Sequence, residues 1–183
     1  MIKRERVSLV PYDREFFKST LSMVNDAQTM AFINRVLPVT EMEHEEWSKK
    51  VLFDKKWILF AITAGKEPRH IGNCGLKDID ERSRKAELWI YLTPQDTDKG
   101  YGIEAISALV EYGFNSLNLN RISAYCLDRN VRAQNAFKKC GFIQEGVFRE
   151  DVYIGGKYRD TMRLAILKKD FMKGNGSDVA ERN

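Results

Sequence analysis

Two segments of the sequence have residue types and spacings that could hold a ligand. The first reads Thr97-Asp98-Lys99-Gly100-Tyr101-Gly102 and lies between a strand-like stretch and an amphipathic helical pattern. Glycines let a backbone approach a ligand closely, and the N–H groups at the start of a helix attract phosphate oxygens. The segment therefore predicts a phosphate-binding loop, with a glycine-containing helix start that holds no ligand as the plain alternative.

The same glycines fit a second motif, because Gly100-x-Gly102-x-x-Ala105 matches the dinucleotide-binding fingerprint. That fingerprint needs its first glycine at the end of a strand, within a unit of parallel strands. Here seven residues separate Leu92 from Gly100, and the preceding strands are typical of an antiparallel meander. The context disfavours a Rossmann site. A Walker A loop is excluded because no Gly-Lys-Ser/Thr follows at the required spacing.

The second segment runs from Asn130 to Phe142 and reads Asn-Val-Arg-Ala-Gln-Asn-Ala-Phe-Lys-Lys-Cys-Gly-Phe. Asn130 is a typical helix N-cap, and Gly141 stands where a left-handed C-terminal cap belongs. By itself the segment predicts a capped amphipathic helix over residues 131–140 and no particular chemistry.

Hydrophobic periodicity predicts the elements that position these two segments. Short apolar runs bounded by turn residues predict strands at 7–10, 57–62, 70–76, 86–92 and 121–127. Helical spacing, with a Thr40–Glu43 capping box, predicts helices at 13–24, 41–53 and 102–117. The stretches 144–154 and 158–167 read as a hairpin joined at Gly155-Gly156. The order β-α-α-β-β-β-α-β-α-β-β indicates an α/β (α+β) fold.

Composition indicates one soluble globular domain. The chain has 183 residues, of which 43% are hydrophobic and 31% charged. No run approaches the roughly 20 apolar residues of a membrane span, and the charged first residues lack the apolar centre of a secretory signal. We expect a domain over residues 1–173, a disordered tail at 174–183, a cytoplasmic location and no membrane partner.

The charged, cysteine and histidine residues exclude several kinds of site. The net charge of +4 is mild and its lysines and arginines are dispersed, so we expect no nucleic-acid partner. A modest positive balance suits a polyanionic ligand. The three cysteines, Cys74, Cys126 and Cys140, read as buried and reduced. Two distant histidines form no ligand spacing with them, so we expect no metal.

Together the two segments identify a family. From about Ala86 to Leu167 the chain resembles the GNAT N-acetyltransferases: strand, Lys-Gly-Tyr-Gly loop, helix, strand, Asn-x-x-Ala-x-x-x-Phe-x-x-x-Gly-Phe helix, then Glu145-Gly146, Tyr158-Arg159-Asp160 and a last strand. It is most similar to the branch of ribosomal-protein N-terminal, spermidine and amino-sugar acetyltransferases. The resemblance implies a single GNAT domain: a mixed central sheet of six or seven strands flanked by helices, with a splayed strand pair that holds acetyl-CoA.

The resemblance also implies where acetyl-CoA, the co-substrate, binds. The pantetheine should hydrogen-bond to the 86–92 strand, the pyrophosphate should meet the N–H groups of the glycine loop, and Phe137 should lie beside the thioester sulfur. The implied cofactor-binding residues are Ile90, Tyr91, Leu92, Thr97, Asp98, Lys99, Gly100, Tyr101, Gly102, Ile103, Asn130, Ala133, Phe137 and Lys139.

Direct attack of a primary amine on the thioester needs a neutral amine, a polarised carbonyl and a protonated or tolerated thiolate. The resemblance implies that Glu87 is the base, acting directly or through water, with a strand glutamate that faces solvent as the alternative. Many relatives place a thiolate-protonating tyrosine where this chain has Phe137, which leaves Tyr91, water or no acid. No catalytic metal is implied.

The loop departs from the family pattern at Thr97 and Asp98, which replace a polar residue and a glycine. A carboxylate near a pyrophosphate is unfavourable unless it points away or pairs with Lys99. We therefore expect ordinary to weak cofactor affinity. A catalytically weak, regulatory acyl-CoA-binding protein is the alternative function that these departures support.

The acceptor is expected to meet the amino-terminal helices and the final hairpin. The acids that begin the 41–53 helix could attract a cationic amine, but acids at a helix N-terminus are also favoured by its dipole. These are Glu41, Glu43, Glu45 and Glu46. A peptide N-terminus or an amino sugar is favoured over a polyamine, because a polyamine enzyme would be more acidic. The final hairpin is also a candidate for pairing in a homodimer.

Overall fold

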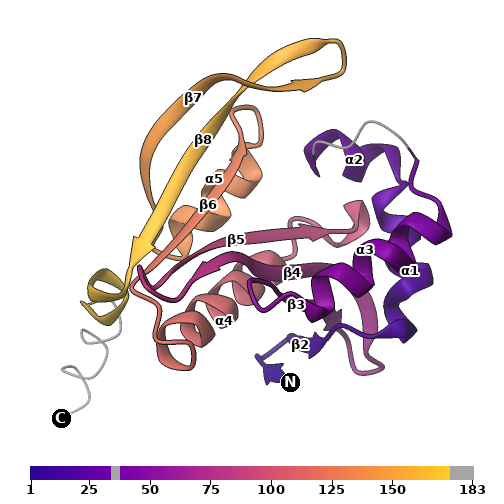
Figure 1. Cartoon of the computed structure of the whole chain (residues 1–183), viewed down its shortest axis with the longest axis horizontal. Helices are drawn as coiled ribbons and strands as arrows, with labels where there is room; N and C mark the ends of the chain where they lie inside the picture. The colour runs from indigo at the N-terminus through magenta and orange to yellow at the C-terminus, as the bar shows by residue number, and fades with distance from the viewer. Residues whose placement is uncertain (34–37, 174–183) are drawn as a thin grey trace.

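One mixed sheet organises the chain in the computed structural model, which describes residues 1–33 and 38–173. Its strand order is β1-β2-β3-β4-β5-β6-β8-β7 (Figure 1). The strands are β1 (Ile2–Lys3), β2 (Val7–Pro11), β3 (Ile58–Ala64), β4 (Arg69–Asp80), β5 (Lys85–Leu92), β6 (Arg121–Leu127), β7 (Ile143–Ile154) and β8 (Lys157–Leu167). The described residues form eight strands instead of six or seven, because the two-residue β1, too short to leave a pattern, pairs with β2.

In the described part of the chain, α-helices and short 3₁₀ turns connect these strands. They are η1 (Arg14–Phe16), α1 (Phe17–Val24), α2 (Ala27–Ile33), α3 (Glu41–Phe53), η2 (Pro94–Asp96), α4 (Tyr101–Asn115) and α5 (Val131–Lys139). Residues 168–173 are also helical. The Thr40–Glu43 capping box is confirmed, and so is the left-handed Gly141 after α5, with φ 85°. The expected tail at 174–183 lies outside the described residues.

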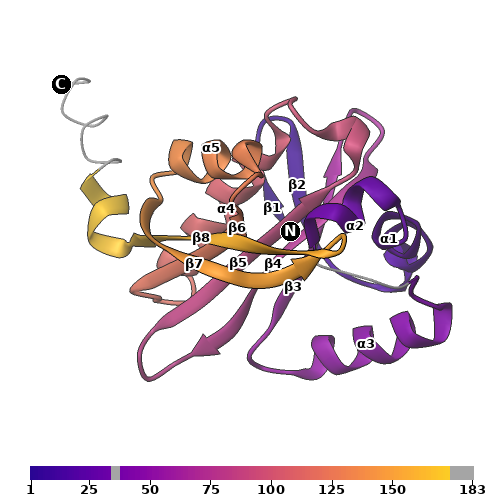
Figure 2. The ribbon, with the colours of Figure 1, turned by 90° about the horizontal axis from the view of Figure 1, so that it is seen from above.

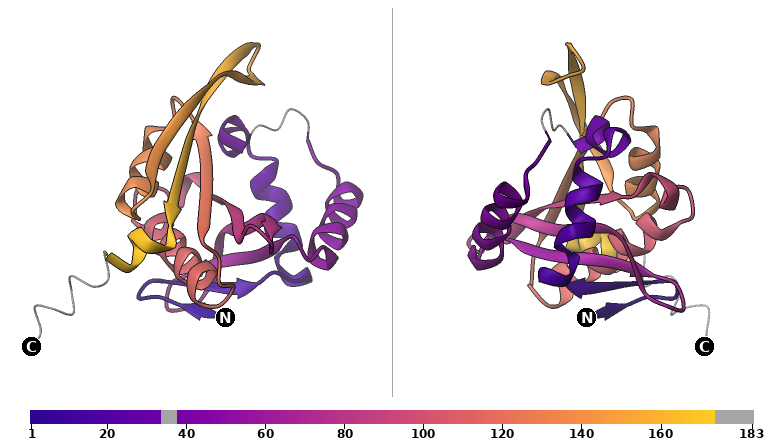
Figure 3. Two further views of the ribbon diagram at one scale, coloured as in Figure 1. Left: turned by 60° about the vertical axis from the view of Figure 1, so that its left-hand side comes forward. Right: turned by 90° about the vertical axis from the view of Figure 1, so that its right-hand side faces the viewer.

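The helices cover both faces of the sheet (Figures 2 and 3). On one face α4 packs against β2, β4 and β5, and buries Leu76, Leu88, Leu109 and Phe114. On the other face α1 and α3 cover a smaller apolar cluster around Leu59. Adjacent strand residues point to opposite faces, so β5 buries Leu88 against α4 and turns its odd-numbered side chains toward the α3 side. No helix in the described part of the chain combines the length and apolar character needed to span a membrane.

The strands β5 and β6 part from each other, as the resemblance implied. They run parallel and pair only where Lys85–Glu87 meets Arg121–Ser123. Beyond this point β5 stays paired with β4 as far as Leu92, whereas β6 continues with β8. Figure 1 shows β6 and the long β7–β8 hairpin rising away from β5, with α2 on the far side of the opening. The edge of β5 from Leu88 to Leu92 is thereby available to a ligand.

Candidate active site

A cavity of about 1340 Å³ opens where β5 and β6 part. Its lining residues come from α1, α2, α3, β5, β6, α4, α5 and the final hairpin. The cavity therefore joins the two predicted segments to the elements expected to meet the acceptor. The predicted site residues that line it are Ile90, Tyr91, Leu92, Thr97, Asp98, Gly100, Gly102, Ile103, Asn130, Ala133, Phe137 and Lys139. Three predicted residues, Glu87, Lys99 and Tyr101, are not among the lining residues of the described chain.

The glycine loop has the geometry of an anion site. Gly100 has φ 83°, a left-handed conformation that favours glycine, and a Cβ there would lie 2.7 Å from the Arg6 guanidinium. The 15-residue helix α4 begins at the next residue, Tyr101. Gly102 and Ile103, in its first turn, line the cavity. A helix N-terminus of this kind carries partial positive charge, so the loop fits the pyrophosphate of a coenzyme A thioester.

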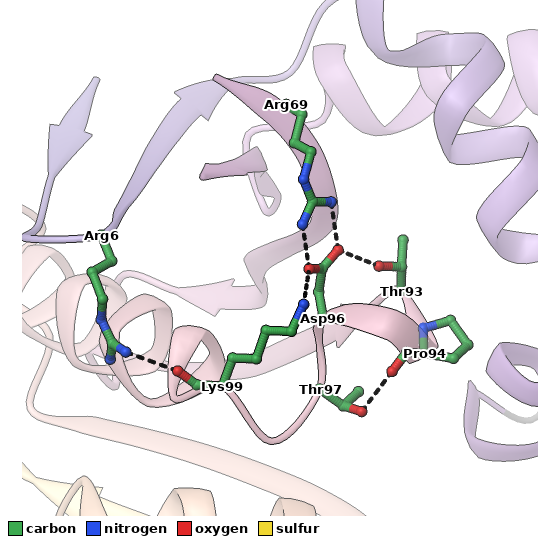
Figure 4. A network of polar contacts seen from close by, with 7 residues as sticks. All are labelled: Arg6, Arg69, Thr93, Pro94, Asp96, Thr97 and Lys99. Carbon is green, nitrogen blue, oxygen red and sulfur yellow. Dashed lines mark hydrogen bonds and ion pairs between the residues drawn. The ribbon is translucent and has the colours of Figure 1, made fainter. Parts of the chain in front are cut away.

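A buried carboxylate anchors this loop (Figure 4). The fully buried Asp96 accepts hydrogen bonds from Arg69 through both oxygens, from Thr93 Oγ1 at 2.7 Å and from Lys99 Nζ at 3.2 Å. The Arg69 guanidinium holds the pKa of Asp96 well below its usual range. Arg6 donates to the Lys99 carbonyl at 2.9 Å and ties the loop to the start of the chain. Asp96 was not predicted from the sequence, because nothing in the polar stretch Pro94–Thr97 marks one residue as buried.

Asp98 has a partner on the neighbouring helix. Its carboxylate meets Arg132 Nε of α5 at 2.9 Å, while Lys99, which the sequence offered as a possible partner, pairs with Asp96. Asp98 also has φ 60°, a left-handed conformation at the position where the family pattern has a glycine. Both Asp98 and Arg132 line the cavity. Arg132 on the neighbouring helix thus compensates the negative charge of Asp98 beside the loop where the pyrophosphate is expected.

Helix α5 supplies an apolar wall. Asn130 caps it by accepting from the Ala133 N–H at 3.1 Å, as the sequence predicted. Phe137 is 3% exposed, packs against Phe142 with ring centroids 5.1 Å apart, and lines the cavity. Without a hydroxyl, Phe137 has no proton to donate.

Aromatic rings dominate the acceptor end of the cavity. Trp89 of β5 lies between Trp57 and Tyr91, with centroid distances of 6.4 and 6.0 Å. On α3, His44 stacks on Trp47 at 5.5 Å, and both line the cavity. A Cβ at Gly75 would clash with the Ile58 carbonyl oxygen and come within 3.1 Å of the Trp89 indole, so this glycine lets β3 approach closely and leaves space beside the ring. The sequence analysis assigned no role to Trp47 or Trp57.

Tyr91 and Glu87 lie on one face of β5 but have different surroundings. The Tyr91 hydroxyl accepts a hydrogen bond from Asn73 Nδ2 at 2.8 Å, and its ring lines the cavity. Glu87 Oε1 lies 2.7 Å from Lys77 Nζ, and its Oε2 lies 3.9 Å from Arg163. Burial is the largest single influence on Lys77 and opposes its charge, but the hydrogen bond and the negative charge of Glu87, together with Tyr125 and Asp78, outweigh it and raise the pKa of the ammonium. Lys77 therefore stays charged at neutral pH.

The acids at the start of α3 have other partners. Glu43 closes the capping box, and Glu45 forms ion pairs with Arg14 and Lys49. Within the described residues, none of the four glutamates from 41 to 46 lines the cavity. The dipole-favoured arrangement accounts for them.

The cysteines of the described chain form no disulfide. Cys74 is completely buried and Cys140 half-buried. Cys126 lines the cavity, and burial raises its pKa to about 11, so it is a thiol at neutral pH. Among residues 1–33 and 38–173, no cluster of three or more histidine, cysteine or acidic side chains could hold a metal ion.

A splayed parallel strand pair, a glycine loop that opens a helix and a capped helix beside them define a coenzyme A-dependent acyltransferase. Residues 6–143 match the acetyltransferase (GNAT) domain family, so the chain belongs to the GNAT acetyltransferases. It is an N-acetyltransferase with acetyl-CoA as the acetyl donor. The fold, a single GNAT domain, is the one the sequence predicted.

Several relatives share both sequence and fold. The spermidine N(1)-acetyltransferase of Vibrio cholerae is 30% identical over 71% of this chain and 75% of its own length. That of Escherichia coli K12 is 26% identical over 91% of this chain and 88% of its own. A crystal structure of the Vibrio cholerae spermidine N-acetyltransferase with CoA and spermine has a TM-score of 0.87 at 25% identity, covering 92% of this chain and 99% of that one.

Proposed function

We propose that the protein transfers the acetyl group of acetyl-CoA to a primary amine by direct attack on the thioester. One observation carries this proposal: a single cavity runs from the glycine loop along the open edge of β5 to an aromatic acceptor end. Donor and acceptor can therefore meet beside Ile90, Tyr91 and Leu92. In this proposal the backbone of these residues holds the pantetheine, the loop Thr97–Ile103 holds the pyrophosphate, and Asn130, Ala133, Phe137 and Lys139 form the wall of α5.

For the leaving thiolate we propose Tyr91 as the proton donor. Its ring lines the cavity, and the Asn73 amide donates to its oxygen, which stabilises the phenolate left after proton transfer. Phe137 of α5 has no hydroxyl and cannot donate this proton.

The surroundings of the cavity favour binding of the acceptor amine in its neutral form. An ammonium in an aromatic-walled cavity near the Lys77 cation loses hydration and is repelled, and both effects favour its deprotonated form. Glu87, which was predicted as the base, bonds Lys77 and does not line the cavity within the described chain, so the lining supports at most a water-mediated role.

The relatives widen the set of acceptors to be tested. The charge of the whole chain disfavours a polyamine, yet two of the relatives are named spermidine N(1)-acetyltransferases. Whole-chain charge is therefore a poor guide, and polyamines join peptide N-termini and amino sugars as acceptor classes.

The test is release of free coenzyme A thiol from acetyl-CoA with a panel of polyamines, peptides, aminoglycosides and amino-sugar nucleotides. We expect release that depends on both protein and amine, above the rate without acceptor. Cofactor binding without amine-dependent release would contradict the proposal and favour a regulatory acyl-CoA-binding protein.

A further inference from the structure

We infer that the acceptor is a primary amine carried on a flat aromatic or other apolar group, with no second positive charge. This inference rests on the proposed function, because it concerns the same cavity. Its first support is the wall of Trp57, Trp89 and Tyr91 from the sheet, faced by Trp47 and His44 from α3. Rings of this kind bind flat apolar groups by stacking and burial.

The charges that line the cavity are the second support. Among the described lining residues the only carboxylate is Asp98, which is at the cofactor loop and is already paired with Arg132. Among residues 1–33 and 38–173, the remaining charged lining residues are Arg132 and Lys139 on α5 and Lys77, the cation on the side of the aromatic rings. The sequence from 27 to 40, which includes α2, holds no aspartate or glutamate.

Two carboxylates that are not among the described lining residues, Glu87 and Asp151, are paired with cations. Glu87 is held by Lys77 and Arg163. Asp151 accepts from the Thr161 hydroxyl and pairs with Arg163 at 3.2 Å. The Arg163 guanidinium is itself stacked over Phe148, 4.4 Å from the ring centroid. Glu87 and Asp151 therefore already pair with cationic side chains of the protein.

The reacting amine loses its proton before it attacks the thioester, so the cavity does not have to hold that charge. A second ammonium would have to enter the same cavity without a carboxylate to pair with it, and a buried charge without a partner is strongly unfavourable. The cavity thus selects against polyamines and for amines with one nitrogen and an apolar body.

The experiment measures kcat/KM by thiol release for amines that differ in one feature. Hexylamine and 1,6-diaminohexane differ by a second ammonium, and 2-phenylethylamine adds a ring; spermidine is included. We expect kcat/KM for hexylamine to be at least about ten-fold higher than for 1,6-diaminohexane and for spermidine. The value for 2-phenylethylamine should be the highest of the four. Equal or faster turnover of 1,6-diaminohexane or spermidine would overturn the inference and leave the proposed function standing. No release with any amine would overturn both.

A pair of variants tests whether the aromatic ring of Trp89 contributes to the choice of acceptor. Trp89→Leu should raise KM for 2-phenylethylamine more than for hexylamine and leave KM for acetyl-CoA unchanged. Phe53→Leu, on a residue that is 86% exposed at the end of α3, is the control and should change neither. An unchanged preference between the two monoamines in a folded Trp89→Leu protein contradicts the inference. If Trp89→Leu does not fold, the kcat/KM values of the wild-type protein for the four amines test the inference on their own.

Discussion

The carboxylate of Glu87 lies between two cations, Lys77 at 2.7 Å and Arg163 at 3.9 Å. A base in contact with the amine would contribute about 10²–10⁴-fold to turnover. Because Glu87 bonds Lys77 and does not line the cavity within the described chain, we expect Glu87→Gln to lower kcat by less than about ten-fold. It should also lower stability by about 1–3 kcal/mol, since Lys77 loses the partner of a mostly buried charge.

Turnover of Glu87→Gln across the pH range is the deciding measurement. A loss of a hundred-fold or more that higher pH partly rescues would show that Glu87 is the base after all. Lys77→Met with Glu87 intact is the matched control for breaking the ion pair from its other side.

Phe137 tests the leaving-group chemistry. Its ring is buried against Phe142 and lines the cavity, so Phe137→Ala should raise KM for acetyl-CoA and lower stability by about 3–5 kcal/mol. Phe137→Tyr adds only a hydroxyl and should leave kcat similar or higher. Steady-state kinetics with acetyl-CoA as the varied substrate measure both. A Phe137→Tyr enzyme that binds acetyl-CoA normally but loses most of its turnover would show that Phe137 is not beside the thioester.

At the scale of elements, the short turn η2 and the loop after it depend on Asp96. Asp96→Asn removes the charge that orders Arg69 and Lys99 around the loop. The variant should bind acetyl-CoA more weakly, with KM for the amine unchanged. Its free energy of unfolding should fall by about 1–3 kcal/mol at pH 7, a moderate loss because the Arg69 side chain is half-exposed.

The effect of Asp96→Asn should depend on pH with a fixed sign. The pKa of Asp96 is lowered in the folded protein, so its charge stabilises the fold above the unfolded value of about 3.9. This contribution is lost as pH falls below that value. The difference in melting temperature between wild type and variant should thus be full at pH 7 and shrink below about pH 4. Asp78→Asn, at an exposed position of β4, is the control; a difference independent of pH would contradict the assignment.

The same loop carries a test at Asp98. Asp98→Gly removes a carboxylate from the pyrophosphate site, relieves a left-handed backbone and leaves Arg132 available to a phosphate. One unit charge at about 4 Å in water is worth about 1 kcal/mol, so KM for acetyl-CoA should fall by about five-fold. Asp98→Asn should give a similar fall, and high salt should reduce it. A higher KM in both variants would show that the carboxylate supports cofactor binding.

At the scale of the whole molecule, what the sequence predicted was local. The Thr40–Glu43 box, the Asn130 cap and the left-handed Gly141 each involve groups three or four residues apart. The resemblance added the splayed strands and the cavity-lining residues around the loop. The helix α2 was missed, although Asp26 accepts from the Thr29 N–H and could have marked its start.

The missed parts of the site depend on contacts between distant residues. Asp96 is buried because Arg69 reaches it from 27 positions away. Glu87 meets Lys77 because the register of β4 and β5 sets them opposite each other, and no local pattern fixes that register. The aromatic end of the cavity assembles from α3, the start of β3 and β5, so single tryptophans in the sequence gave no sign of it.

Acetyl-CoA should raise the stability of the whole domain, because the cavity joins elements from both halves of the chain. A ligand that binds only the folded state at 100 times its Kd adds about 2.7 kcal/mol of stability. For a chain of this size that corresponds to a melting-temperature rise of about 5–10 °C.

Gly100→Val forces a Cβ into the Arg6 guanidinium and a left-handed backbone onto a branched residue, so it should abolish the rise. Gly146→Val, at a position where a Cβ meets nothing within 4 Å, should retain it. Thermal melts with and without millimolar acetyl-CoA measure both, and an unshifted wild-type melt would contradict cofactor binding at this cavity.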